Sequence, residues 1–249
     1  TYVDHQGKEM SESDIFFTYL EDITSNFVIP ANSTIILRDA SGTTGSTLGS
    51  TLYSTELALL KTAVNASSGV NLIFLDFSHT VYSSTFKAYT GCESFSGAGF
   101  TFLRSSGVFQ NNTNLKSLYL PRVYAPLSNS YSGCTSLTDF CGQDFDPSTG
   151  NCAGAFASCS SLKYLNLPSA TYQGRLTTFS NCTSLQEIWF TADNFFFDDT
   201  QTTAFSGTTT ENIRLVLGAN HAVADIDGVY ATGDEGTIYT FRQIDVLSE

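Results

Sequence analysis

The sequence is short of basic side chains, and this shortage restricts the partners it can have. Its 249 residues carry 24 Asp and Glu against 11 Lys and Arg, a formal net charge of −13. Binding to nucleic acid or to an anionic membrane surface requires cationic side chains that neutralise phosphate groups. We therefore expect no nucleic-acid partner.

Long apolar runs are also missing. No stretch approaches the roughly 18 to 20 apolar residues that a membrane-spanning helix needs, so we expect no membrane insertion of this segment. The first ten residues, "TYVDHQGKEM", lack the charged and apolar regions of a signal peptide, as a mature exported protein or a truncated piece of a longer chain would. The 20 Phe and 12 Tyr, with few Lys, are also typical of exported proteins. We expect an extracellular protein, at the cell surface or secreted.

Histidines are few and scattered, which argues against catalysis and metal binding. His5, His79 and His221 lie far apart and far from any Cys-x-x-Cys pair, so they predict neither a zinc site nor a Ser/His/Asp or Cys/His arrangement. The acidic stretches "DFDPST" (144–149) and "DIDGVYATGDEG" (225–236) lack the spacing of a phosphatase motif or a calcium loop, and turns explain them better. We expect no enzymatic activity, no cofactor and no metal.

A repeated motif is the main feature that the sequence does contain. An aromatic residue, two residues, a cysteine, two residues and an apolar residue recur 20 to 26 residues apart, and an apolar-x-x-apolar-x-apolar strand pattern follows, as in "LKSLYL", "LKYLNL" and "LQEIWF". Asn112 and Thr208 stand in the place of the cysteine in two units. Such a period predicts a solenoid, in which each unit buries its apolar side against its neighbours. The motif begins at Tyr89, Phe109, Tyr131, Phe156, Phe179 and, in degraded form, at Phe205.

The cysteines divide into two groups. Cys92, Cys134, Cys159 and Cys182 occupy equivalent repeat positions, which predicts a buried column of thiols that pack as small hydrophobic groups. Cys141 and Cys152 lie outside this column, eleven positions apart. In an exported protein they can form a disulfide or remain free, and the sequence leaves both open.

The motif resembles the BspA-like leucine-rich repeat, also called the Treponema pallidum type, of bacterial and some protist surface proteins. The resemblance covers about residues 70–217 and rests on "CTSL", "CSSL" and the Leu-Pro pairs that end at Pro121 and Pro168. It implies an α/β fold, a right-handed leucine-rich-repeat solenoid with a parallel sheet on its concave side, mostly β and irregular coil. It also implies an extracellular role in adhesion or protein binding.

The flanking segments predict caps at both ends of the solenoid. Helical spacing of apolar residues after Ser11 and Asp14 predicts a helix over 11–25, a strand pattern covers 33–39, and "STELALLKTAVNAS" predicts a second helix over 54–67. Two β-rich runs after Leu217 predict a hairpin. We therefore expect an N-terminal cap over 1–69 (helix, strand, helix), about six to seven repeat units over 70–217, and a C-terminal β cap over 218–249.

The candidate binding residues are the side chains that the repeat pattern directs away from the core. Strand residues alternate between faces, so the exposed concave set is Lys116, Ser117, Tyr119, Thr138, Asp139, Lys163, Tyr164, Asn166, Gln186, Glu187, Trp189, Arg214 and Val216. Exposed Tyr and Trp are frequent at binding hot spots. The candidates for ligand contact are Lys116, Tyr119, Asp139, Lys163, Tyr164, Asn166, Gln186, Glu187 and Trp189.

These residues lead to two functional hypotheses. The first is a non-catalytic surface or secreted adhesin whose concave face recognises a glycan or a protein, either host extracellular or bacterial surface. The second is a structural spacer that displays other domains of a longer surface protein. The sequence does not separate a protein ligand from a glycan, because aromatic side chains beside Asn, Gln and Asp suit both.

Overall fold

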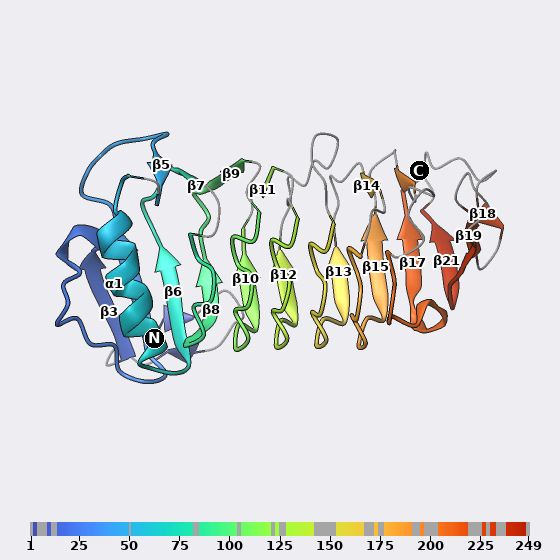
Figure 1. Ribbon diagram of the computed structural model, residues 1–249, viewed down its shortest axis with the longest axis horizontal. Coiled ribbons are helices and arrows are strands. Elements are labelled where there is room, and N and C mark those ends of the chain that lie inside the picture. The colour runs from blue at the N-terminus through green and yellow to red at the C-terminus, as the bar shows by residue number, and fades with distance from the viewer. Residues whose placement is uncertain are drawn as a thin grey trace.

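Successive coils of the chain each add one strand to a long parallel sheet that runs along the whole molecule (Figure 1). This is the solenoid that the repeat predicts. The computed structural model describes residues 2–3, 9–10, 14–49, 51–81, 85–103, 106–120, 123–124, 128–141, 153–166, 172–173, 177–190, 195–196, 204–218, 226–227, 230–232 and 238–247.

The long sheet has two sections, both parallel throughout. In spatial order the first section contains β3 (Ile15–Tyr19), β4 (Thr34–Arg38), β6 (Val70–Phe74), β8 (Cys92–Ser96), β10 (Ser117–Tyr119) and β12 (Asp139–Cys141). The second section contains β13 (Tyr164–Asn166), β15 (Glu187–Phe190), β17 (Arg214–Leu217) and β21 (Gln243–Val246). We call the outward side of both sections the sheet face.

Shorter strands and one helix make up the other sides of the coils. Helix α1 (Ser54–Asn65) lies at the N-terminal end and buries Leu57, Leu60 and Val64, which confirms the helix expected there. Further elements are the parallel set β5 (Thr47–Leu48), β7 (Thr80–Val81), β9 (Thr101–Leu103) and β11 (Val123–Tyr124), the parallel pair β14 (Tyr172–Gln173) and β16 (Phe195–Phe196), the antiparallel pair β1 (Tyr2–Val3) and β2 (Glu9–Met10), and the 3-10 turns η2 (Leu20–Asp22) and η4 (Thr210–Asn212).

A stack of aromatic rings forms the axis of the core. Each ring lies nearly parallel to the next, with centroids 5.1 to 6.1 Å apart and interplanar angles of 9° to 27°, the offset stacking that aromatic quadrupoles favour. The aromatic residue of the motif is therefore a packing residue, as the repeat predicts. The stack runs through Phe86, Phe109, Tyr131, Phe156, Phe179 and Phe205.

The first unit of the stack begins at Phe86, three residues before the Tyr89 that the sequence motif indicates. Phe86 stacks on Phe109, and its N–H donates to Val108 as the N–H of Phe109 donates to Ser130. Ala88, two residues after Phe86, has a left-handed φ of 57°, and Asn111, two residues after Phe109, has a left-handed φ of 63°. The motif alignment at Tyr89 is wrong, because Cys92 produces an aromatic-x-x-Cys match three residues out of register.

The cysteine position of the motif satisfies a buried carbonyl group. The thiol of Cys159 donates to the carbonyl oxygen of Tyr131, one unit earlier, at 3.2 Å, and Cys134 and Cys182 make the same bond to their preceding units. At the two positions without cysteine, the Asn112 amide donates to the carbonyl of Phe86 and the Thr208 hydroxyl to that of Phe179. The position therefore selects a compact side chain that can donate a hydrogen bond, since an unsatisfied buried carbonyl is costly.

Cys134, Cys159 and Cys182 form the predicted column of buried thiols, whereas Cys92 is buried but lies three residues out of register and donates to the carbonyl of Ser94 in its own unit. Burial suppresses the ionisation of all four thiols. Burial raises the pKa of Cys92, Cys134 and Cys182 to about 12 and raises the pKa of Cys159 well above its ordinary value. Since the thiolate is the nucleophile and the metal ligand, these side chains serve packing rather than chemistry.

The predicted helix over 11–25 is wrong. Residues 15–19 form strand β3, which pairs in parallel with β4 along its full length, and η2 follows it; residues 11–13 lie outside the described part. The apolar residues fit helical spacing, but they are β-branched and aromatic, types that favour strands. Pairing with β4, a contact distant in sequence, decides the outcome.

The strand predicted over 33–39 is confirmed as β4. After Leu217, the predicted hairpin corresponds to the antiparallel pair β19 (Tyr230–Thr232) and β20 (Ile238–Thr240), and β18 (Ile226–Asp227) pairs with β19. β21 then returns to the long sheet beside β17.

Candidate functional site

The two sections of the long sheet meet at β12 and β13, where the ladder of hydrogen bonds stops (Figure 1). On the turn side of the same coils the stacking continues, because the N–H groups of Asn129, Tyr131 and Gly133 donate to Ala153, Ala155 and Ala157 at 2.8 to 2.9 Å. Among the described residues, the two coils therefore stay bonded on the turn side and separate at the strands. We call this interruption the sheet break.

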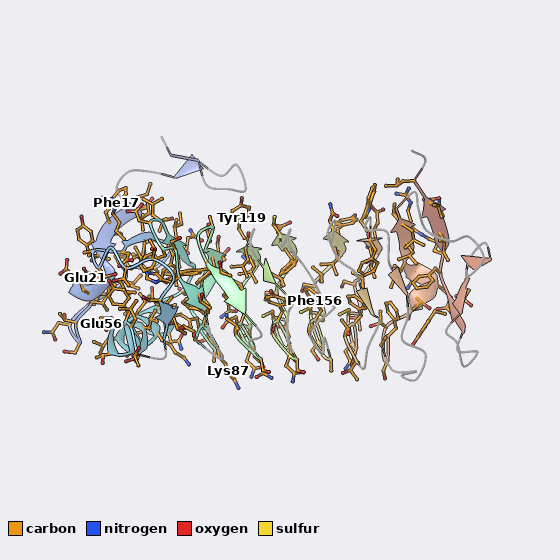
Figure 2. All side chains as sticks on the ribbon, turned by 90° about the horizontal axis from the view of Figure 1, so that it is seen from above. Phe17, Glu21, Glu56, Lys87, Tyr119 and Phe156 are labelled. Carbon is orange, nitrogen blue, oxygen red and sulfur yellow. The ribbon has the colours of Figure 1, made fainter. Side chains whose placement is uncertain are left out.

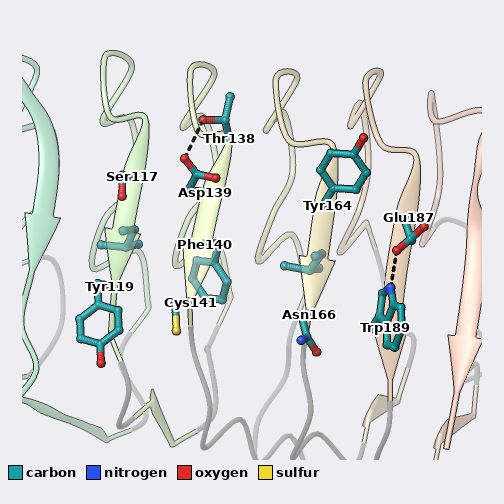
Figure 3. Close-up of a pocket in the computed structure, with 12 residues that line it drawn as sticks. Ser117, Tyr119, Thr138, Asp139, Phe140, Cys141, Tyr164, Asn166, Glu187 and Trp189 are labelled. Atoms are coloured by element: carbon teal, nitrogen blue, oxygen red, sulfur yellow. Dashed lines mark hydrogen bonds between the residues drawn. The ribbon is translucent and has the colours of Figure 1, made fainter. Parts of the chain in front are cut away.

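A groove of about 760 Å³ lies across the sheet break. It is lined from four strands, and its volume falls within the range of ligand sites in proteins. In Figure 3, Tyr119, Cys141, Asn166 and Trp189 form one row across the strands, while Ser117, Asp139, Tyr164 and Glu187 form the row beside it. The lining residues are Ser117, Leu118, Tyr119, Thr138, Asp139, Phe140, Cys141, Tyr164, Leu165, Asn166, Glu187 and Trp189.

Trp189 is held in a fixed position at one end of the groove. Its indole N–H donates to the carboxylate of Glu187, two residues earlier on β15 (Figure 3). The guanidinium carbon of Arg214 lies 5.9 Å from the ring centroid, and Arg214 Nη1 lies 3.3 Å from Glu187 Oε2. Arg214 Nε also contacts Asp245 Oδ2 at 2.6 Å. Hydrogen bonds to Glu187 and Asp245 raise the pKa of Arg214, with the Asp245 bond the larger contribution, so the cation is stabilised.

Tyr164 and Asn166 line the groove on the β13 side. Tyr164 is 59% exposed, and its hydroxyl donates to Gln186 Oε1 at 3.3 Å. Asn166 is exposed and carries both an amide donor and an amide acceptor into the groove (Figure 3). This side therefore combines an aromatic surface with neutral polar groups.

Asp139, Cys141 and Tyr119 line the groove on its other side. Asp139 is exposed, and the hydroxyl of Thr138 lies 3.5 Å from its Oδ2. Cys141 is a half-buried free thiol whose pKa is raised by burial, and Cys152 lies outside the described residues. Tyr119 is half-buried at the end of β10.

The structure brings six of the nine predicted contact residues together in the groove: Tyr119, Asp139, Tyr164, Asn166, Glu187 and Trp189. Lys116, Lys163 and Gln186 are exposed one residue before the strands and flank it. Lys116 Nζ is paired with Glu93 Oε1 at 2.7 Å.

Two residues of the wider exposed set are buried instead. Ser117 is 2% exposed because its short side chain lies between Ser94 and Asp139 on the adjacent strands. Val216 is fully buried between Trp189 and Asp245. Alternation along a strand predicts the direction of a side chain, but larger neighbours decide its exposure.

The sequence-based reasoning missed the N-terminal part of the sheet face. Phe17, Ile36 and Ile73 follow one another across β3, β4 and β6, and Phe17 is 58% exposed. The strand-like composition of "IFFTY" at 15–19 was the signal that could have shown this part of the face.

Metal binding and membrane insertion find no support in the described part of the chain. No group of three or more His, Cys, Asp or Glu side chains among the described residues could hold a metal ion. Within the same residues, no helix has the length and apolar character needed to cross a membrane. The stretch 144–149 lies outside the described residues.

Comparison with known proteins identifies the repeat. The family model described as a BspA type leucine-rich repeat region, with six copies, matches residues 60–186 and 105–221, together well over half of the chain. The chain therefore belongs to the BspA type leucine-rich repeat family. Searches of curated proteins and of solved structures found no match.

Proposed function

We propose that the protein is a non-catalytic binding protein of the cell surface or secreted space, an adhesin that recognises its ligand through the sheet face at the sheet break. Family membership supports a surface repeat protein. The observation that carries the proposal is the gathering of six predicted contact residues, three of them aromatic, in one groove. Tyr and Trp in such a position provide large contact areas with little loss of side-chain entropy.

We further propose that the coils are right-handed, as crossovers between parallel strands favour, and that the repeats over 70–217 are capped by 1–69 and 218–249. Tyr239 and Phe241 support the C-terminal cap, because their rings pack edge-on against Phe205, the last ring of the stack, at 5.3 and 5.8 Å.

The experiment is capture of the protein on immobilised extracellular-matrix proteins and on a glycan array, with a Trp189→Ala, Tyr164→Ala double variant for comparison. We expect specific capture by the wild-type protein and loss of capture by the variant. Far-UV circular dichroism and thermal unfolding of both proteins check that the variant remains folded.

Capture that survives in the folded double variant contradicts the proposal that the groove is the binding site. Absence of capture on both panels by folded wild-type protein favours the spacer hypothesis, in which the solenoid displays other domains of a longer surface protein.

A further inference from the structure

We propose that the groove at the sheet break binds a neutral oligosaccharide. This inference rests on the proposed binding function and specifies the chemical class of its ligand. The observations that carry it are the charge balance around the groove, the fixed aromatic surfaces and the neutral amide groups between them.

The charges around the groove nearly cancel, in contrast with the −13 of the whole chain. Arg214 is bracketed by Glu187 and Asp245, and Lys116 is paired with Glu93. Asp139 and Lys163 place opposite charges on the two sides of the sheet break. The groove therefore has no strong electrostatic potential of one sign that would attract a highly charged ligand. A neutral polar ligand is not repelled by charges of either sign.

The aromatic rings provide surfaces on which sugar rings can stack. The C–H groups of a sugar carry partial positive charge and pack against the negative face of an aromatic ring. Trp189 is held by Glu187 and Arg214 before any ligand arrives, so little conformational entropy is lost when a sugar binds to it. Tyr164 offers a second, more exposed ring on the adjacent strand β13.

The polar groups between the rings match hydroxyl groups, which both donate and accept hydrogen bonds. The amide of Asn166 can donate and accept at the same time. It lies directly beside Trp189 in the register of β13 and β15. Gln186, which flanks the groove, accepts from the Tyr164 hydroxyl with its oxygen and so helps to hold that ring in place.

The length of the groove fits a short chain of sugars rather than a single one. The lining runs from Tyr119 on β10 to Trp189 on β15. These positions are three strand intervals apart: the two hydrogen-bonded intervals add about 10 Å at the usual strand spacing, and the interval across the sheet break lies between them. An oligosaccharide running across the strands could contact Tyr119, Tyr164 and Trp189 in turn.

The test uses Trp189 as an internal reporter, because it is the single tryptophan of the chain. Its fluorescence emission is followed while chitotriose, cellotriose and maltotriose are titrated into the full chain. We expect a saturable emission change with at least one of them. We also expect affinity to weaken about tenfold or more in Asn166→Ala and in Tyr164→Ala.

The matched control is Phe17→Ala, which removes an aromatic ring of the same exposure, 58% against 59%, from the other end of the sheet face. It should leave the saccharide affinity unchanged. Equal affinity of wild type and folded Asn166→Ala and Tyr164→Ala would overturn the inference.

The protein panel separates failure of the inference from failure of the proposed function. Capture on an immobilised extracellular-matrix protein, without an emission change of Trp189 on titration with any of the saccharides, overturns the inference and leaves the binding function standing. Neither capture nor an emission change contradicts both.

Discussion

The two sections of the long sheet share one repeat but present different outward faces. In the first three strands of the six-stranded section the row through Phe17, Ile36 and Ile73 is apolar, and it becomes polar at Ser96 on β8. In the four-stranded section the corresponding row contains Asn166 and Trp189. The inward rings are alike in both sections because each must stack on the next. The outward positions carry no such constraint. Figure 2 shows Phe17 and Tyr119 on the outward side of the coils, while Phe156 lies in their interior.

The interiors of the two sections also differ. Near the N-terminal end, His79 Nε2 lies 2.7 Å from Asp39 Oδ2, and the Tyr53 hydroxyl donates to Asp39 Oδ1 at 2.6 Å. Burial acts to raise the pKa of Asp39, but hydrogen bonds from Tyr53, Ser41 and His79 outweigh it and lower that pKa. Burial and the bond to Asp39 raise the pKa of Tyr53 to about 12. The N-terminal section thus contains a buried polar cluster in addition to the ring stack that runs through both sections.

Phe156→Ala should produce the largest loss of stability, because this ring joins the stack of one section to that of the other. Phe156 is fully buried and lies between Tyr131 and Phe179. Its truncation should cost about 3–5 kcal/mol of unfolding free energy. Urea unfolding followed by circular dichroism and by Trp189 fluorescence measures the loss, and a loss below about 1 kcal/mol would contradict the role given to the stack.

Raising the pH should destabilise the protein through its buried thiols. Their folded pKa values lie above the ordinary 9.0, so the unfolded state releases these protons first and stability falls as pH rises from about 9 towards 12. For four thiols the loss between about pH 8 and about pH 9.5 is roughly 3 kcal/mol. Urea midpoints across this range measure it, with Cys159→Thr expected to show a shallower decline. An unchanged midpoint would mean that the thiols ionise equally in both states.

Asp39→Ala tests the polar cluster of the N-terminal section. The substitution leaves the buried His79 and Tyr53 without their shared partner, which should cost about 2–3 kcal/mol. Asp76→Ala is the matched control, since Asp76 is 40% exposed in its pair with Arg38 and should cost less than about 1 kcal/mol. Equal losses in the two variants, measured by chemical unfolding, would show that the cluster adds nothing beyond a surface ion pair.

A smaller effect should distinguish Cys159→Val from Cys159→Thr. The two replacements have nearly the same shape, but only threonine can donate to the carbonyl of Tyr131, as Thr208 does to Phe179 in the last unit. We expect valine to be less stable by about 1 kcal/mol. If the unfolding free energy of Cys159→Val equals or exceeds that of Cys159→Thr, the repeat position requires a side chain of this volume and not a hydrogen-bond donor.

The core could be predicted from the sequence because its rings and thiols recur at fixed positions of the repeat. Features that depend on contacts made only once in the fold could not be predicted in this way. The stacked rings from Phe109 to Phe205 recur with the motif, and the thiol column follows from them. The first unit was misaligned at Tyr89 because a chance match at Cys92 satisfied the same pattern. The strand over 15–19 was missed because its pairing with β4 is not local in sequence.

The site was predictable in part for the same reason. Alternation along the strands identified Tyr164, Asn166 and Trp189 as outward residues, which the groove confirms. The sheet break was not predictable, because it depends on how two coils separate in space. The burial of Ser117 and Val216 likewise depends on neighbouring strands.

The most direct test of the central claim, that ligand binds at the sheet break, is amide hydrogen exchange of the protein with and without a ligand captured from the panels. We predict that exchange slows on binding mainly in 117–119, 138–141, 163–166 and 186–190, with no change in 15–19 or 34–38. Slowed exchange confined to 15–19 and 34–38 would place the binding surface on the apolar N-terminal strands and contradict binding at the sheet break.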